Sequence, residues 1–234
     1  MDFPMRINKY LAHKGHATRR EADTLIEKGL VLINGVRATL GSKVTEKDTV
    51  EVKSRTLRQY VYLAFNKPKG VITLAETKDE KDSLSYLPSD LKRLRLFPLG
   101  RLDKSSCGLI LLTNDGRVTD RLLNPDRNHE KTYEVTTKDD LRPSFAEHME
   151  KGVDIEGYTT KATSVEVLTE RKFRITLTEG KKHQIRRMVV AMHNEVKDLK
   201  RISIMNIKLA NLPVGGYRRI EGKELQTFLT SLGL

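Results

Sequence analysis

Short, strand-like apolar runs outnumber helical patterns in this chain of 234 residues, and the two kinds of segment do not alternate. Regular alternation would favour a parallel sheet with crossover helices, so its absence favours an α+β fold with a mixed, mainly antiparallel sheet. The strand-like runs are residues 60–66, 71–74, 109–113, 132–136, 163–168 and 173–177. Helical periodicity is found near residues 118–123, 144–150, 184–192 and 223–232.

The first fifty residues follow a different pattern, in which two helices precede a β-hairpin. Apolar residues at helical spacing begin at Ile7, and Thr18-Arg19-Arg20-Glu21 is a capping-box sequence that predicts the start of a second helix. Two apolar runs flank Asn34-Gly35, which predicts a hairpin with a two-residue turn, and a further strand is expected at 49–52. We therefore expect a small module at residues 1–52, a linker at 53–60 and a second domain at 61–234.

The net charge and the cysteine content indicate what kind of partner the chain binds and in which cellular compartment it is found. The formal net charge is +12, and residues 1–60 alone hold twelve Lys and Arg against seven Asp and Glu. A basic excess in both regions favours a nucleic acid partner. A membrane is not expected, because no segment combines a basic face with Trp and Phe anchors and no apolar run reaches transmembrane length. The single Cys forms no intramolecular disulfide, so a cytoplasmic protein is expected.

A charged loop that leads into an apolar run contains the strongest candidate for chemistry. Asp103 lies there between Arg101 and Lys104, just before a turn and the strand-like run 109–113. A scaffold can hold a reactive carboxylate rigidly at such a place. The alternative is a surface Arg–Asp ion pair that closes the turn.

Other catalytic classes find little support in the sequence. The six His are scattered without zinc-site spacing, so no metal is expected. There is no P-loop, and no G-x-G-x-x-G opens a βαβ unit. Cys107 as a nucleophile would need a base such as His nearby, and none is adjacent in sequence. A small residue that fills a tight turn before Gly108 is the better interpretation of this cysteine.

Two further segments could complete a site around Asp103. A basic run from Gly180 opens a helix, and its adjacent residues Arg186 and Arg187 point in different directions. One arginine could face a buried carboxylate while the other contacts phosphate, although an ordinary basic helix explains the run as well. Tyr133 lies on an alternating strand, where it is either a core residue or a stacking surface for an unstacked base.

These three segments together resemble the pseudouridine synthases in their RsuA/RluF-type form. The family pattern of R-L-D-x-x-[ST]-x-G, K-x-Y and [HR]-Q-[IL]-R is matched by Arg101-Leu102-Asp103…Ser106…Gly108, Lys131-Thr132-Tyr133 and His183-Gln184-Ile185-Arg186. The resemblance implies that Asp103 is the catalytic aspartate, that Tyr133 packs on the target uracil and that Arg186 pairs with Asp103. It also implies a catalytic cleft, an Arg101 that enters the RNA near the space vacated by the uridine, and a reaction without a cofactor.

The N-terminal module resembles the S4 RNA-binding domain. The matching segments are Arg6-Ile7-Asn8-Lys9-Tyr10-Leu11, Thr18-Arg19-Arg20-Glu21-Ala22 and Val31-Leu32-Ile33-Asn34-Gly35. The candidate RNA contacts are Arg6, Lys9, Arg19 and Arg20 in this module and Arg101, Lys104 and Arg187 beyond it. Residues 199–207 resemble the RluF branch, which modifies large-subunit ribosomal RNA. Ribosomal RNA is therefore the expected substrate, with transfer RNA as another, and a monomer is expected.

A protein without catalytic activity is the main alternative. An S4-type ribosome-assembly factor would explain the charge and the first module equally well. It would leave the conjunction of Asp103, Tyr133 and Arg186 in the second domain without a reason. An S4-linked methyltransferase would need a cofactor-binding loop, and the sequence has none.

Overall fold

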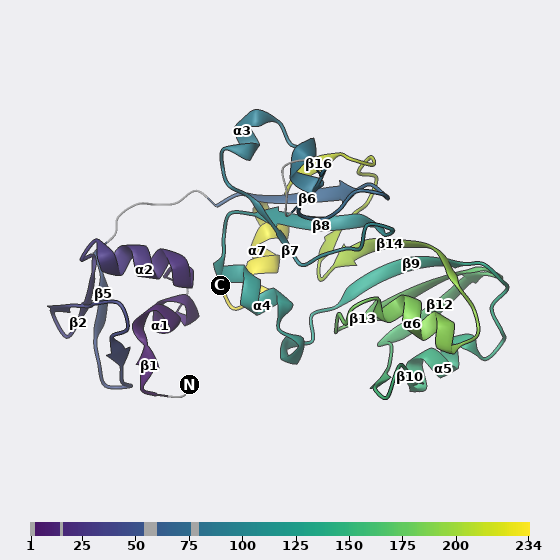
Figure 1. The fold of residues 1–234 in the computed structure, drawn as a ribbon, viewed down its shortest axis with the longest axis horizontal. Helices are drawn as coiled ribbons and strands as arrows, with labels where there is room; N and C mark the ends of the chain where they lie inside the picture. The colour runs from purple at the N-terminus through teal and green to yellow at the C-terminus, as the bar shows by residue number, and fades with distance from the viewer. Residues whose placement is uncertain (1–2, 15, 54–59, 76–79) are drawn as a thin grey trace. The chain divides into compact units, whose positions relative to one another are not determined.

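The computed structural model describes residues 3–14, 16–53, 60–75 and 80–234. It divides the chain into two compact units (Figure 1). One contains residues 1–60 with 115–121 and residue 234, and the other contains residues 61–114 and 122–233. Most of the linker expected at 53–60 lies outside the described residues. Within the described ranges, no helix is both long enough and apolar enough to span a membrane.

The N-terminal unit contains two helices and short strands around its own apolar core. Helix α1 is Ile7–His13 and α2 is Arg19–Glu27, and Thr18 caps α2 through the predicted reciprocal bonds with Glu21. Strands β2 (Val31–Ile33), β3 (Val36–Arg37) and β5 (Val50–Val52) form one sheet, and β1 (Met5–Arg6) pairs with β4 (Lys43–Val44). Asn34 and Gly35 both have positive φ, as the tightest hairpin turn requires.

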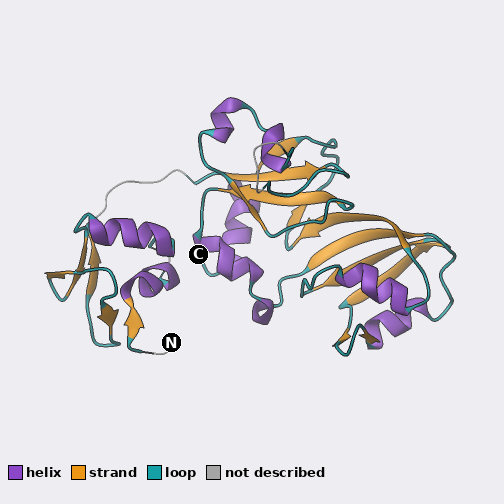
Figure 2. Ribbon diagram, in the orientation of Figure 1, coloured by secondary structure: helices purple, strands orange, loops and turns teal. Residues whose placement is uncertain are grey.

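The second unit is organised around one sheet of nine strands in the order β12-β13-β9-β14-β8-β6-β16, with β15 on β14 and β7 on β8. Figure 2 shows strands in orange and helices in purple. The strands are β6 (Tyr62–Lys67), β7 (Phe97–Leu99), β8 (Cys107–Thr113), β9 (Lys131–Thr137), β12 (Ser164–Thr169), β13 (Lys172–Leu177), β14 (Val196–Ile204), β15 (Ile207–Lys208) and β16 (Tyr217–Arg219). Only the β14–β8 pair is parallel among the described pairs. The expectation of an α+β fold with a mixed, mainly antiparallel sheet is confirmed.

Helices pack against this sheet and bury its apolar side chains. Helices α5 (Phe145–Lys151) and α6 (Gln184–Ala191) share a core with β9 and β13, in which Phe145 and Phe173 make an edge-to-face contact. Helix α7 (Gly222–Ser231) places Phe228 against Tyr62 of β6. The remaining short elements are α3 (Ser89–Lys92), α4 (Arg117–Leu123), the 3₁₀ turns Ser83–Tyr86 and Pro125–Arg127, and the paired strands β10 (Val153–Asp154) and β11 (Thr159–Thr160).

The prediction of a strand at residues 71–74 is wrong. This segment makes a single isolated bridge, between Ile72 and Asp82. It cannot join the sheet beside β6, because β6 already pairs with β8 on one side and β16 on the other. Its backbone therefore follows a different path, and Thr73 contacts the loop that carries Asp103.

Candidate active site

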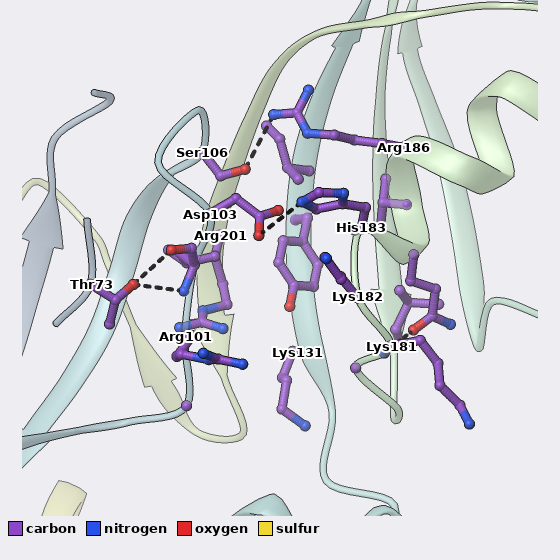
Figure 3. A pocket seen from close by; sticks show the side chains of 18 of the residues that line it. Thr73, Arg101, Asp103, Ser106, Lys131, Lys181, Lys182, His183, Arg186 and Arg201 are labelled. Atoms are coloured by element: carbon purple, nitrogen blue, oxygen red, sulfur yellow. Dashed lines mark hydrogen bonds and ion pairs between the residues drawn. The ribbon is translucent and has the colours of Figure 1, made fainter. Parts of the chain in front are cut away.

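A cavity of about 780 Å³ opens in the second unit and gathers most of the residues singled out in that part of the sequence. Its walls come from residues 72–74, the loop 100–106, strand β9, the segment 177–186 that leads into α6, and strand β14 (Figure 3). Asp103, Tyr133, Arg186, Arg101 and Lys104 all line it. Segments far apart in sequence thus converge on one hollow, as the family resemblance implies.

The loop between β7 and β8 holds Asp103 in place through bonds to its backbone. The buried Thr73 hydroxyl accepts from the Leu102 amide at 2.9 Å and donates to the Leu102 carbonyl at 2.7 Å. The Ser106 amide donates to the Asp103 carbonyl at 3.0 Å and closes a turn. The residue immediately before the carboxylate is therefore fixed by a side chain 29 positions away.

The side chain found beside Asp103 is that of His183, whose Nε2 lies 3.4 Å from the carboxylate, within ion-pair distance for a protonated imidazole. His183 is the N-cap residue of α6 and has a φ of 53°, which is uncommon for a residue with a side chain and often marks a functional site. The Arg101–Asp103 pair considered from the sequence does not form, since Asp103 has no other ion-pair partner among the residues the structure describes.

The predicted direct pairing of Arg186 with Asp103 is not present. Arg186 donates to the Ser106 hydroxyl at 3.2 Å and to the Ser105 carbonyl at 3.4 Å, so it contacts the far end of the same loop. The reason is its place on α6, three residues after His183, which occupies the position beside the carboxylate. Arg186 therefore anchors the Asp103 loop and supplies positive charge to the cavity wall.

Lys67 is a second cation close to Asp103 that sequence reasoning missed. Its side chain is fully buried at the end of β6, and its Nζ donates to the carbonyls of Pro68 and Val71. Burial lowers the pKa of Lys67 to about 8, while the negative charge of Asp103 acts to raise it. The only signal in the sequence is the turn that follows this lysine.

Tyr133 and Lys131 project into the cavity from β9. Tyr133 is 8% exposed and belongs to the apolar core, as the first interpretation predicts; it also lines the cavity, and base stacking by its ring stays a prediction. Burial, with the nearby charge of Arg201, lowers the pKa of Lys131 to about 8. Arg201, on β14, lines the same cavity and was not predicted.

The buried Gln184 fixes the segment that leads into α6. Its side-chain amide donates to Thr160 and Glu179, both at 2.7 Å, and its carbonyl accepts from the Lys181 amide at 2.9 Å. Glu179 also accepts from the Thr160 and Tyr158 hydroxyls, and these bonds hold the pKa of its carboxyl below its usual range against the effect of burial. Gln184 thus positions its two neighbours in the motif, His183 and Arg186.

Arg187 is not part of the cavity wall. It forms an ion pair with Glu156 at 2.6 Å and donates to the Ile155 carbonyl at 3.2 Å. The two adjacent arginines do point in different directions, but the second contacts the protein itself, which argues against the phosphate contact expected for it.

Cys107 begins β8 and its thiol points at the Leu199 carbonyl, with a sulfur–oxygen distance of 3.7 Å. Burial raises the pKa of this thiol, which disfavours the reactive thiolate. In the described part of the chain, no group of three or more His, Cys, Asp or Glu is placed to hold a metal ion.

The four candidate RNA contacts of the N-terminal unit have a different setting. Arg6, Lys9, Arg19 and Arg20 are all exposed to solvent. Within the described residues none of them forms an ion pair. Their charges are available to an outside partner.

Comparison with known proteins agrees with this fold. The family model for RNA pseudouridylate synthase matches residues 61–191, and the S4 domain model matches residues 5–50. The chain is 41% identical over 229 residues to the dual-specificity RNA pseudouridine synthase RluF of Escherichia coli K12, covering 96% of this chain and 78% of that protein. It is 33% identical over 230 residues to the ribosomal large subunit pseudouridine synthase B of Bacillus subtilis 168, covering 94% of each.

A solved structure supports the same conclusion. The crystal structure of a pseudouridylate synthase superposes with a TM-score of 0.70 at 28% identity, covering 97% of this chain and 99% of that one. The chain belongs to the RNA pseudouridine synthases. Within them it is an enzyme of the RsuA/RluF type, which joins an S4 domain to the catalytic domain.

Proposed function

We propose that this enzyme isomerises a uridine of large-subunit ribosomal RNA, with Asp103 as the catalytic carboxylate, Tyr133 packed on the target uracil and Arg186 as the positive charge that supports Asp103. The observation that carries this assignment is the convergence of all three residues on one cavity. The large-subunit function in the name of the Bacillus subtilis relative, which aligns over 94% of both chains, supports the choice of RNA.

The reaction is an isomerisation, so atoms balance without a co-reactant. The N1–C1′ bond of the uridine breaks, the freed uracil rotates, C5 joins C1′, and the proton on C5 is lost while N1 gains one. Asp103 attacks the sugar or the uracil ring, or removes a ribose proton in a glycal route. Each of these routes needs an ionised carboxylate held rigidly, and the bonds from Thr73 and Ser106 to its loop supply that rigidity.

The target uridine must leave its stack to enter the cavity, at a cost of roughly a few kcal/mol. Arg101 is exposed next to Asp103 and can occupy the space that the base leaves. Tyr133 offers one face to the extruded uracil, since aromatic rings stack on bases readily. Its hydroxyl is also a candidate acceptor for the C5 proton after the new bond forms.

RNA affinity is assigned to the N-terminal unit. Arg6, Lys9, Arg19 and Arg20 are exposed on β1, α1 and α2, and such cations bind phosphates without reading sequence. They would hold the RNA while the cavity acts on one nucleotide.

Tritium release tests this proposal. The enzyme is incubated, with no cofactor added, with large-subunit ribosomal RNA transcripts labelled with tritium at uridine C5, and with transfer RNA transcripts labelled in the same way. We expect release from the ribosomal RNA that depends on Asp103. Release from transfer RNA alone would overturn the substrate assignment. Binding of the RNA without any release would favour the non-catalytic assembly factor.

A further inference from the structure

A buried arginine without a counter-charge stands beside the catalytic residues. Arg201 is 3% exposed, and its one hydrogen bond runs from Nε to the Leu109 carbonyl at 2.8 Å. Its Nη2 is buried with no hydrogen-bond partner, and no carboxylate among the described residues forms an ion pair with it. A buried cation that lacks an anion is costly, so this arrangement points to a ligand that supplies the missing charge.

Sheet geometry places this arginine, a lysine and the tyrosine on one face. Arg201 on β14 is the register partner of Tyr133 on β9, and paired residues on neighbouring strands project to the same side of a sheet. Lys131 precedes Tyr133 by two positions on the same strand, so it also points to that side. All three line the cavity, and Figure 3 shows Arg101, Arg201 and Lys131 gathered on the same side of it.

A glycine on strand β8 allows β14 to approach closely at Arg201. Strand β14 runs parallel to β8 with Arg201 opposite Gly108, and a Cβ at Gly108 would lie 2.3 Å from the Arg201 carbonyl oxygen. Gly108 also has a φ of 103°, which side chains disfavour. Only glycine permits the close approach that carries Arg201 to the cavity.

Among the described residues, the carboxylates of the cavity wall form no ion pair with Arg201 or Lys131. Asp103 lies beside His183, and Glu179 accepts bonds from Tyr158, Thr160 and Gln184. Glu80 lines the cavity too and has no ion pair with Lys131 or Arg201. Among the described residues, the side chains of the two cations therefore have one acceptor each, the Leu109 carbonyl at 2.8 Å for Arg201 and the His129 carbonyl at 2.9 Å for Lys131.

We propose that Arg201 and Lys131 form a phosphate subsite that binds a phosphodiester group next to the target uridine while its uracil rests on Tyr133. A guanidinium and an ammonium together suit phosphate oxygens, and the shared face puts the phosphate beside the ring. This inference rests on the proposed function of Tyr133. The subsite fixes the reacting nucleotide, in contrast to the exposed cations of the N-terminal unit.

Mononucleotide binding to the full chain tests the subsite. Isothermal titration calorimetry compares uridine with uridine 5′-monophosphate and uridine 3′-monophosphate at pH 7 and low salt. We expect one monophosphate to bind at least about tenfold more tightly than uridine, the gain typical of a charge-assisted contact. Arg201→Met should abolish this preference and leave uridine binding unchanged. Lys131→Met should reduce it several-fold.

Two controls test whether a lost phosphate preference is due to the cavity cations themselves. Lys223→Met removes an exposed charge on α7 outside the cavity, and it should leave the preference intact. Thermal unfolding checks that the Arg201→Met variant folds. If it does not fold, Arg201→Lys and Lys131→Met are compared with the wild type instead, because each changes one cation only.

The subsite is overturned if neither monophosphate binds more tightly than uridine, if no nucleotide binds at concentrations of about 10 mM, or if the preference survives both cavity variants. Tritium release on the same preparations separates this from the proposed function. If tritium is released but no monophosphate binds more tightly than uridine, the phosphate subsite is wrong and the proposed reaction stands. If a monophosphate binds more tightly but no tritium is released, the proposed reaction is wrong and the phosphate subsite stands.

Discussion

The two units of this enzyme use positive charge in different ways. The N-terminal unit presents Arg6, Lys9, Arg19 and Arg20 to solvent without ion-pair partners among the described residues. The second unit buries cations instead: the pKa values of Lys131, on the cavity wall, and of Lys67, at the end of β6, are lowered to about 8. Exposed charges attract a polyanion over a distance and are screened by salt, whereas buried charges are costly and act on one group. Affinity and positioning are therefore expected to respond to different substitutions.

The largest effect is expected from Asp103→Asn. Activity should fall below about 1% of wild type, because loss of an acid–base or nucleophilic group typically costs about 10²–10⁴-fold. RNA affinity should stay nearly the same, since the shape of the side chain is kept. Tritium release and filter binding measure the two quantities, with Asp90→Asn on α3 as a matched exposed control. If RNA binding and tritium release fell by the same factor, RNA affinity and catalysis would not be assigned to separate units of the chain.

Arg186→Met should reduce activity by roughly tenfold to a hundredfold, the cost of a small misplacement of a catalytic group. The variant loses the bonds to Ser105 and Ser106 and so releases the far end of the loop that carries Asp103. Arg187→Met is the control, because Arg187 pairs with Glu156 outside the cavity. Equal losses in both variants would show that α6 matters only as a whole.

Removing exposed positive charge from the N-terminal unit should weaken RNA binding and leave the rate of the reaction unchanged. Arg19→Gln combined with Arg20→Gln should weaken RNA binding several-fold and flatten its salt dependence, by about 0.7–0.9 in log–log slope for each phosphate that the variant no longer neutralises. The rate at saturating RNA should be unchanged. Binding isotherms across a salt series check the slope. An unaltered slope would place the RNA contact elsewhere on the surface.

The smallest expected effect is on stability and comes from Lys67. Its pKa is about 8 in the folded chain and its ordinary value is 10.5, so the unfolded chain holds this proton more tightly. Between those values the unfolded state binds more protons, and the free energy of unfolding should rise as pH increases from 8 toward 10.5, by on the order of 2 kcal/mol. Urea unfolding at pH 7 and pH 9.5 measures this rise. Lys67→Met should reduce it, while Lys9→Met, on exposed α1, should not.

Local sequence signals predict local structure well in this chain. The capping box at Thr18 and the Asn34-Gly35 turn depend on neighbours within a few residues, and both form as expected. Strand β14 is missed because its apolar residues Val196, Leu199 and Ile202 are three positions apart, separated by pairs of charged residues, and so make neither an apolar run nor a strict alternation. The 71–74 segment has the composition of a strand, but the occupancy of both edges of β6 decides its conformation, and no local pattern reveals that.

The same limit applies to the candidate site. Asp103, Tyr133 and Arg186 are found through a resemblance in motifs, and the cavity brings them together. The role of Thr73 depends on a contact across the fold, to a residue 29 positions away, and the pKa of Lys67 depends on its burial in the folded chain. No local pattern indicates that His183, three residues before Arg186, takes the place beside the carboxylate.

Chain order adds a consequence during synthesis on the ribosome. Among the described residues, every strand partner within the N-terminal unit lies between residues 5 and 52, so its strands can pair soon after they emerge. The cavity needs β14, which ends at Ile204, and β6 acquires its partner β16 only at Tyr217–Arg219. At about 5–20 residues per second, the delay between the two is on the order of ten seconds or more. A nascent chain therefore presents the exposed cations of its N-terminal unit well before its cavity is complete.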